Sequence, residues 1–219
     1  MNNYDNYNIC EILTMVKQNP CIITKLPDKY KFNKNIILEV VISDLWYFFK
    51  RIPKEYRDDE DIVLAAVRNN GYNLEYVSYK FKNNIKIVLE AVRKNGCAIQ
   101  YASDNLKNNK FVALEAVKND GRAIFYIPEY LINDLDIILE AIKTNYNALI
   151  HVSDDIKDND YIIKEAIKYH SSSMMYASKR LINNRKFNRH WFYNTKLYDY
   201  KNYVFINKFY CLRTFFLKF

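Results

Sequence analysis

Apolar residues recur in the same order every 25 residues between Asp58 and Ile182. Three copies of this phrase contain the only glycines of the chain, Gly71, Gly96 and Gly121. The five copies read IVLAAVRNNGYNLEYVS, IVLEAVRKNGCAIQYAS, VALEAVKNDGRAIFYIP, IILEAIKTNYNALIHVS and IIKEAIKYHSSSMMYAS. A fixed period of this length is the signature of a repeat protein, in which each unit packs mainly on its neighbours.

Each copy begins with a segment whose apolar spacing predicts a helix of about ten residues. One copy places Ile87, Val88, Ala91 and Val92 on a single face of that helix. Alanine recurs at positions 66, 91, 116, 141 and 166. We expect neighbouring helices to approach closely at this small residue.

Polar residues and glycine predict where these helices begin and end. Short acceptor side chains precede three of them, as Asn83-Asn84, Asn108-Asn109 and Asn133-Asp134, and are suited to cap the free amide groups. At the other end we expect glycine to close the helix in the left-handed conformation. Tyr146 and Ser171 stand where glycine stands in the other copies, so we expect looser or differently shaped turns there.

A second, shorter helix and a short turn complete the unit. The predicted fold is therefore all-α, a right-handed α-solenoid of 25-residue helix–turn–helix repeats. A leucine-rich repeat would need an LxxLxL strand, and tetratricopeptide and ankyrin units are longer. We divide the chain into degenerate N-terminal capping repeats (1–57), five repeats (58–182) and a basic aromatic C-terminal cap or tail (183–219).

The net charge of +8 is distributed unevenly along the chain. Residues 58–182 carry sixteen basic and eighteen acidic side chains, a balance of −2. Residues 183–219 carry eight basic side chains and one acidic side chain, a balance of +7. The repeats therefore lack the basic surface that tracks a nucleic-acid backbone, whereas the tail has the composition for it.

The sequence contains no recognisable constellation for catalysis, cofactor binding or metal binding. HExxH, GxxxxGK[ST] and GxGxxG are absent, and the four cysteines form no CxxC pair. We therefore predict no catalytic, cofactor-binding or metal-binding residues, and no cofactor. We expect no secretory signal and no transmembrane segment, and hence a cytoplasmic protein.

Repetition turns single residues into rows. Basic residues stand at 68, 93, 118, 143 and 168, and the last four of them follow glutamates at 90, 115, 140 and 165 by three positions. We interpret these as i,i+3 pairs on a solvated face. Tyr76, Tyr101, Tyr126 and Tyr176, with His151 in the same position, form an aromatic row. We interpret this row as core packing between stacked units.

A binding face is expected where the copies differ. Two positions of the second helix, three residues apart, change freely between copies. At the later of the two positions, the last three copies carry the apolar residues Phe125, Ile150 and Met175. The candidate partner surface comprises Tyr72, Glu75, Gln100, Arg122, Phe125, Ile150 and Met175. Burial of this row beneath the tail is an equally weighted alternative.

The repeated phrase resembles the domain-of-unknown-function 4116 repeat family. The matching residues in one copy are Ala91, Val92, Gly96, Ala98, Tyr101, Ala102, Ser103 and Leu106. The resemblance covers Asp58 to Ile182 well, residues 1–57 weakly and the tail not at all. It implies an α-helical array and a host-cell setting, because similar repeats occur in large DNA viruses of amoebae and in intracellular bacterial effectors. It implies no reaction.

Two functions follow as hypotheses. The first is a non-enzymatic scaffold that binds another protein, in the host cytoplasm if the chain is viral. The alternative is binding of nucleic acid, or of a membrane surface, through the tail. Its candidate contacts are Arg189, Trp191, Lys196, Lys201, Lys208 and Arg213. The tail could also be a folded cap, which we favour, or a degenerate extension.

Overall fold

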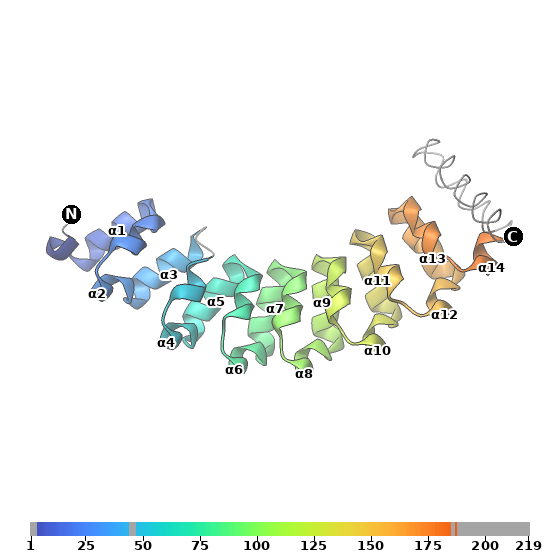
Figure 1. Ribbon diagram of the computed structural model, residues 1–219, viewed down its shortest axis with the longest axis horizontal. Coiled ribbons are helices and arrows are strands. Elements are labelled where there is room, and N and C mark those ends of the chain that lie inside the picture. Colours follow the sequence, from blue (N-terminus) through green and yellow to red (C-terminus); the bar gives the residue numbers. More distant parts are fainter. Residues whose placement is uncertain (1–3, 44–46, 185–186, 188–219) are drawn as a thin grey trace, which may run out of the picture. The chain divides into compact units, whose positions relative to one another are not determined.

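The computed structural model describes residues 4–43, 47–184 and 187, and every regular element in these ranges is helical (Figure 1). The predicted all-α class is confirmed. The chain divides into two compact units, residues 1–151 and residues 152–219, and each is described by itself.

Each repeat consists of a main α-helix, a 3₁₀ segment and a one-turn α-helix. The main helices are α1 (Ile9–Gln18), α3 (Lys34–Ile42), α5 (Glu60–Asn69), α7 (Ile85–Lys94), α9 (Lys110–Asn119), α11 (Leu135–Thr144) and α13 (Asp160–Tyr169). The 3₁₀ segments are η2 (Pro20–Lys25), η3 (Phe49–Arg51), η4 (Gly71–Glu75), η5 (Gly96–Tyr101), η6 (Gly121–Tyr126), η7 (Tyr146–Ile150) and η8 (Ser171–Tyr176), and η1 (Tyr4–Asn6) precedes α1. The one-turn helices are α2 (Asp28–Lys31), α4 (Lys54–Arg57), α6 (Tyr79–Lys82), α8 (Asp104–Lys107), α10 (Glu129–Ile132), α12 (Asp154–Lys157) and α14 (Lys179–Ile182). The predicted second helix is thus a 3₁₀ helix.

Within residues 1–151 the repeats stack in chain order. Each main helix packs against the next, from α1 to α11, and η4, η5, η6 and η7 pack in the same succession. Figure 1 shows α5, α7 and α9 side by side, with α4, α6 and α8 along one edge. This arrangement of successive helices is that of an α-solenoid. In the second unit, η8 packs against α13.

The core follows the apolar stripe of the main helices. In α7, Ile87, Val88, Ala91 and Val92 have no solvent-exposed surface. The equivalent positions of α5, α9 and α11 are also fully buried. The helical spacing therefore predicts the core correctly, because residues three and four apart share one face of a helix.

The predicted N-caps are also present. The Asn84 side-chain oxygen accepts hydrogen bonds from the amides of Lys86 at 3.0 Å and Ile87 at 3.4 Å. Asn109 and Asp134 cap α9 and α11 in the same way. These side chains satisfy amide groups that have no partner within the helix.

Residues 1–57 keep the same order of elements. The segments α1–η2–α2 and α3–η3–α4 each follow the order main helix, 3₁₀ segment and one-turn helix. Asn8 forms a complete capping box with Glu11 at the start of α1. The role of these two repeats as caps of the array stays a prediction.

The prediction for the glycines is wrong. None of Gly71, Gly96 and Gly121 adopts a left-handed φ. Each opens a 3₁₀ segment after an extended residue, such as Asn95 with φ −141°. Asn145 and His170, which precede the glycine-free copies, have φ −147° and −144°. The expectation of differently shaped turns at Tyr146 and Ser171 is therefore also wrong.

Glycine is instead required by the next repeat. A Cβ added to Gly96 would approach the carbonyl oxygen of Ala116 to less than 3.0 Å, and it would lie 2.9 Å from the amide nitrogen of Asp120. Gly71 and Gly121 meet the carbonyls of Ala91 and Ala141 in the same way. The close approach predicted at the recurring alanine is thus present, with glycine as its partner.

The glycine amide makes a hydrogen bond across the same boundary. The Gly96 N–H donates to the Asn119 side-chain oxygen at 2.7 Å, and the Gly71 N–H donates to that of Asn95 at 2.8 Å. For Gly121 the acceptor is the Thr144 hydroxyl at 2.9 Å. The missing Cβ therefore permits both close packing and a bond between repeats.

We predict that Gly96→Ala lowers the free energy of unfolding by about 1–3 kcal/mol, because the new methyl group overpacks the boundary. In an unstrained helix the same change would stabilise by roughly 0.5–1 kcal/mol. Urea denaturation of the full chain measures the difference. Ser171→Ala, at a position that already carries a side chain, is the control and should change the stability little. Stability retained in Gly96→Asn would indicate a left-handed requirement instead, since asparagine tolerates that conformation.

Candidate partner-binding face

The 3₁₀ segments η4, η5, η6 and η7 form a continuous face of the first unit. A 3₁₀ helix has about three residues per turn, so residues three apart lie above one another. In η4, Asn73 and Leu74 point into the core, while Tyr72 and Glu75 are exposed. We call the exposed side of these four segments the 3₁₀ face.

The structure brings six of the seven predicted partner residues to the 3₁₀ face. They are Tyr72, Glu75, Gln100, Arg122, Phe125 and Ile150, of which Gln100 is half-buried and the others are exposed. Phe125 keeps 41% of its surface exposed and Ile150 keeps 46%. Met175 is 62% exposed on η8, in the second unit. Their role in binding stays a prediction.

The second residue of each 3₁₀ segment is exposed in η4 and η6 but buried in η5. Cys97 stands where Tyr72 and Arg122 stand in the neighbouring copies, and it is buried. Its thiol lies 3.5 Å from a carboxylate oxygen of Asp120. Burial, followed by the charge of Asp120, raises the pKa of the Cys97 thiol to about 11. A protonated, buried thiol of this kind is a poor nucleophile.

The core interpretation of the aromatic row is wrong. Tyr76 and Tyr101 are half-buried, and Tyr126 and His151 are exposed. These residues stand at the C-terminal ends of their 3₁₀ segments. The His151 ring contacts the ring of Phe125 in the preceding repeat. The row therefore widens the 3₁₀ face. Tyr176 is half-buried in the second unit.

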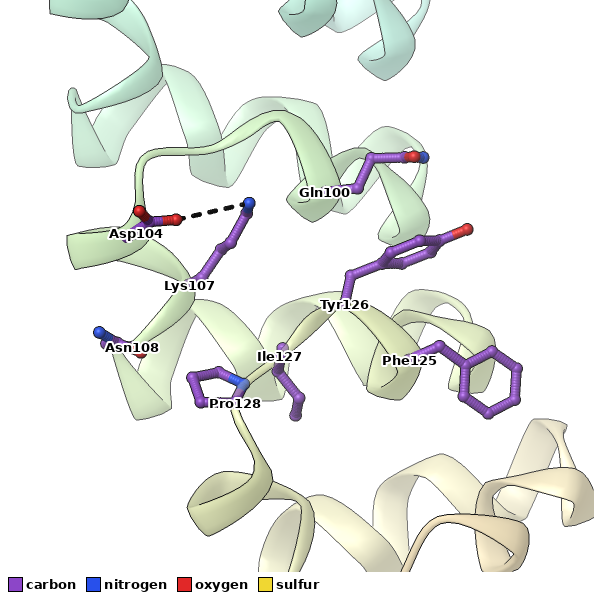
Figure 2. A pocket seen from close by; sticks show the side chains of 8 residues that line it. All are labelled: Gln100, Asp104, Lys107, Asn108, Phe125, Tyr126, Ile127 and Pro128. Carbon is purple, nitrogen blue, oxygen red and sulfur yellow. Dashed lines mark ion pairs between the residues drawn. The ribbon is translucent and has the colours of Figure 1, made fainter.

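Contacts across the 3₁₀ face change character from repeat to repeat. Glu75 lines one depression together with Tyr72 and Tyr76. Gln100 and Tyr126 line another depression together, and Figure 2 shows the Tyr126 ring directed toward Gln100. The rings of Phe125 and His151 meet edge to face, with centroids 4.9 Å apart. One backbone scaffold thus presents an acidic, then an amide, then an aromatic surface.

Glu75 sets the electrostatics of one end of this face. Burial and then a hydrogen bond to the Glu75 carboxylate raise the pKa of the Tyr76 phenol. Burial and then the Glu75 charge raise the pKa of Tyr101. Both shifts mean that ionised phenol is disfavoured beside a carboxylate. Tyr72 also has a raised pKa, caused by burial first and by Cys97 second.

Two depressions lie on the 3₁₀ face. The first, of about 370 Å³, is lined by Asn70, Tyr72, Asn73, Glu75 and Tyr76. The second, of about 540 Å³, is lined by Gln100, Asp104, Lys107, Asn108, Phe125, Tyr126, Ile127 and Pro128 (Figure 2). Lys107 faces into the second depression and pairs with Asp104 at 3.7 Å. Both depressions are open to solvent and suit side chains of a macromolecule better than an enclosed small molecule.

The acidic and basic rows lie on the main helices. The predicted i,i+3 pairing is confirmed for the three lysines and wrong for Arg93. Arg68 and Arg93 reach across a repeat boundary to Glu90 at 2.8 Å and Glu115 at 2.9 Å. The lysines of the row pair within their own helix, as Lys118 does with Glu115 at 3.2 Å. The hydrogen bond from Arg68 lowers the pKa of Glu90. These exposed pairs contribute little to stability, but they leave no free basic row for phosphate.

Other predicted features are limited to the described residues. Within residues 4–43, 47–184 and 187, no group of three or more histidines, cysteines and carboxylates could hold a metal ion. No helix in these ranges is long and apolar enough to cross a membrane. The six candidate nucleic-acid contacts between 189 and 213 lie outside the described residues.

Comparison with known proteins gives one match. The family model described as "Domain of unknown function (DUF4116)" matches six overlapping segments, 11–57, 33–82, 59–107, 84–132, 109–157 and 134–182. Each match spans about two main helices, as expected when neighbouring repeats pack as pairs. No curated protein and no solved structure gives a significant match.

We predict that Glu75→Gln lowers the pKa of both Tyr76 and Tyr101, because removal of the carboxylate charge makes the phenolate less unfavourable. The pKa of Tyr72 should stay unchanged, which provides an internal control. Titration of tyrosines labelled with ¹³C at Cζ, assigned through single Tyr→Phe variants, measures all three. Unchanged values for Tyr76 and Tyr101 would show that Glu75 does not contact them in solution.

Proposed function

Because the chain belongs to the DUF4116 family of helical repeats, we propose that it is a non-enzymatic scaffold that binds another protein through the 3₁₀ face. One observation carries the proposal. The buried positions of the repeats hold a small set of residues, whereas the exposed positions of the 3₁₀ face change in size, charge and polarity.

The contrast is sharpest between adjacent residues. Position 74 and its equivalents are Leu, Ile, Ile and Leu, and all four are fully buried. The next position holds Glu75, Gln100, Phe125 and Ile150. Packing fixes the first set, and stability places no comparable demand on the second. Variation on an otherwise repeated scaffold is how helical-repeat proteins distinguish their partners.

The chemistry of the face favours a protein partner. Exposed Phe125, Tyr126 and Ile150 provide apolar and aromatic surface of the kind enriched in protein interfaces. Nucleic acid would require an unopposed basic row. Here the exposed Arg122 is paired with Asp120 at 2.7 Å, and the repeats carry a balance of −2.

Binding of nucleic acid or a membrane surface through the tail is the second candidate. The observation that favours it is the balance of +7 over residues 183–219, interleaved with aromatic residues. Such a segment would give salt-dependent binding that is independent of the 3₁₀ face.

The proposal extends to the setting of the protein. The resemblance of the repeated phrase to this family implies a host-cell setting. We therefore place the partner in a host cell and the protein in the host cytoplasm.

Affinity capture from a nuclease-treated amoebal extract tests this function. The full-length protein should retain a discrete protein, and Phe125→Asp/Ile150→Asp should lose it, because two charges enter the apolar part of the 3₁₀ face. Phe111→Asp/Leu135→Asp is the matched control. Both control residues are 51% exposed apolar side chains, but they lie at the starts of α9 and α11.

The control variant should capture the partner as the wild-type protein does. Capture that disappears with nuclease would instead support the tail as the binding segment. Equal capture by both variants would refute the 3₁₀ face as the binding surface.

A further inference from the structure

Glu75 differs from the glutamates of the main helices in its partners. Glu90, Glu115, Glu140 and Glu165 each pair with a lysine or an arginine. Across the described ranges, no lysine or arginine forms an ion pair with Glu75. Glu75 instead lines a depression together with Tyr72 and Tyr76. An exposed carboxylate without an ion-pair partner keeps its negative charge available to a cation.

The first depression surrounds this carboxylate with cation-binding groups. Tyr72 and Tyr76 contribute aromatic rings, and Asn70 and Asn73 complete the lining. Aromatic faces and a carboxylate together attract an ammonium or a guanidinium group, by cation–π and charge-assisted hydrogen bonding. The volume of about 370 Å³ is sufficient for one long basic side chain.

The nearby basic residues are already engaged. The Arg57 guanidinium lies 3.5 Å from the backbone carbonyl of Tyr76. Arg122, whose charge reaches Tyr72, is held by both carboxylate oxygens of Asp120. Neither arginine neutralises Glu75 by direct pairing.

We propose that the first depression binds a lysine or arginine side chain of the partner protein, with Glu75 as the charged contact. This inference rests on the proposed function and specifies the chemistry of the partner. The second depression lies further along the 3₁₀ face, beside Phe125, and takes an apolar side chain of the same segment. The rings of Phe125 and Tyr126, with Ile127 and Pro128, provide apolar surface there, beside the polar side chains of Gln100, Asp104, Lys107 and Asn108.

The distance between the two depressions sets how many residues of the partner segment separate its basic side chain from its apolar one. Neighbouring packed helices lie about 8–10 Å apart, so Glu75 and Phe125 are separated by roughly 20 Å. An extended chain advances about 3.3 Å per residue, which corresponds to about six residues. The charged side chains that line the second depression, Lys107 and Asp104, pair with each other, so the charge of the segment is expected at the Glu75 end only.

Selection of a random twelve-residue peptide library on the immobilised full-length protein tests the inference. Enriched peptides should carry lysine or arginine about six residues from a large apolar residue. Synthetic fluorescent versions should bind roughly ten- to a hundredfold more weakly to Glu75→Gln, because a charge-assisted hydrogen bond is lost. Their affinity should fall with added salt. Glu129→Gln, an exposed glutamate at the start of α10, should change the affinity less than about twofold.

The outcomes separate this inference from the proposed function. Peptides that require Phe125 but lack a basic residue, or that bind Glu75→Gln as tightly as wild type, would overturn the inference alone. Failure to enrich any peptide, or binding that survives both Phe125→Asp and Glu75→Gln, would overturn the inference and the 3₁₀ face together.

Discussion

The starts of η4, η5 and η6 lie so close to the following main helices that their first residues, Gly71, Gly96 and Gly121, have no room for a Cβ. At Gly96 the obstructing groups are the Ala116 carbonyl and the Asp120 amide. The same glycine donates its N–H to Asn119, so the close packing is also directional. This contact fixes where each repeat sits on the next one. The alignment of η4, η5, η6 and η7 into one face follows from it.

That alignment separates two kinds of position along each 3₁₀ segment. Buried residues such as Ile99 and Ile124 must fill the space set by the glycine contact, and changes in their volume are costly. Residues one position later project outward, and their chemistry is free to change from Glu75 to Gln100 to Phe125. Stability therefore constrains one residue and leaves its neighbour free to vary. A repeat protein can change its partner in this way while keeping its fold.

Sequence reasoning succeeds here for interactions within one repeat and fails for interactions between repeats. The helix lengths, the Asn84 cap and the buried stripe depend on residues a few positions apart. The role of Gly96 and the pairing of Arg93 with Glu115 depend on residues about 20 positions away, whose distance no local pattern reveals. A glycine after asparagine favours a left-handed turn, yet the same motif also fits a steric requirement of the next unit. For the 3₁₀ face, the exposed rows could be predicted, but the depression that Glu75 lines together with Tyr72 and Tyr76 could not. The adjacency of Glu75 and Tyr76 was the only local signal.

The 3₁₀ face ends where the first compact unit ends. Its last members, Ile150 and His151, stand in the first copy that has Tyr146 in place of glycine, and the first compact unit ends at His151. The backbone before Tyr146 keeps the extended conformation found before glycine, so the substitution leaves the repeat itself intact. Between Tyr72 and His151 the 3₁₀ face belongs to the first unit, where Gly71, Gly96 and Gly121 each contact the next repeat. Met175 is exposed and equivalent in sequence, but it belongs to the second unit.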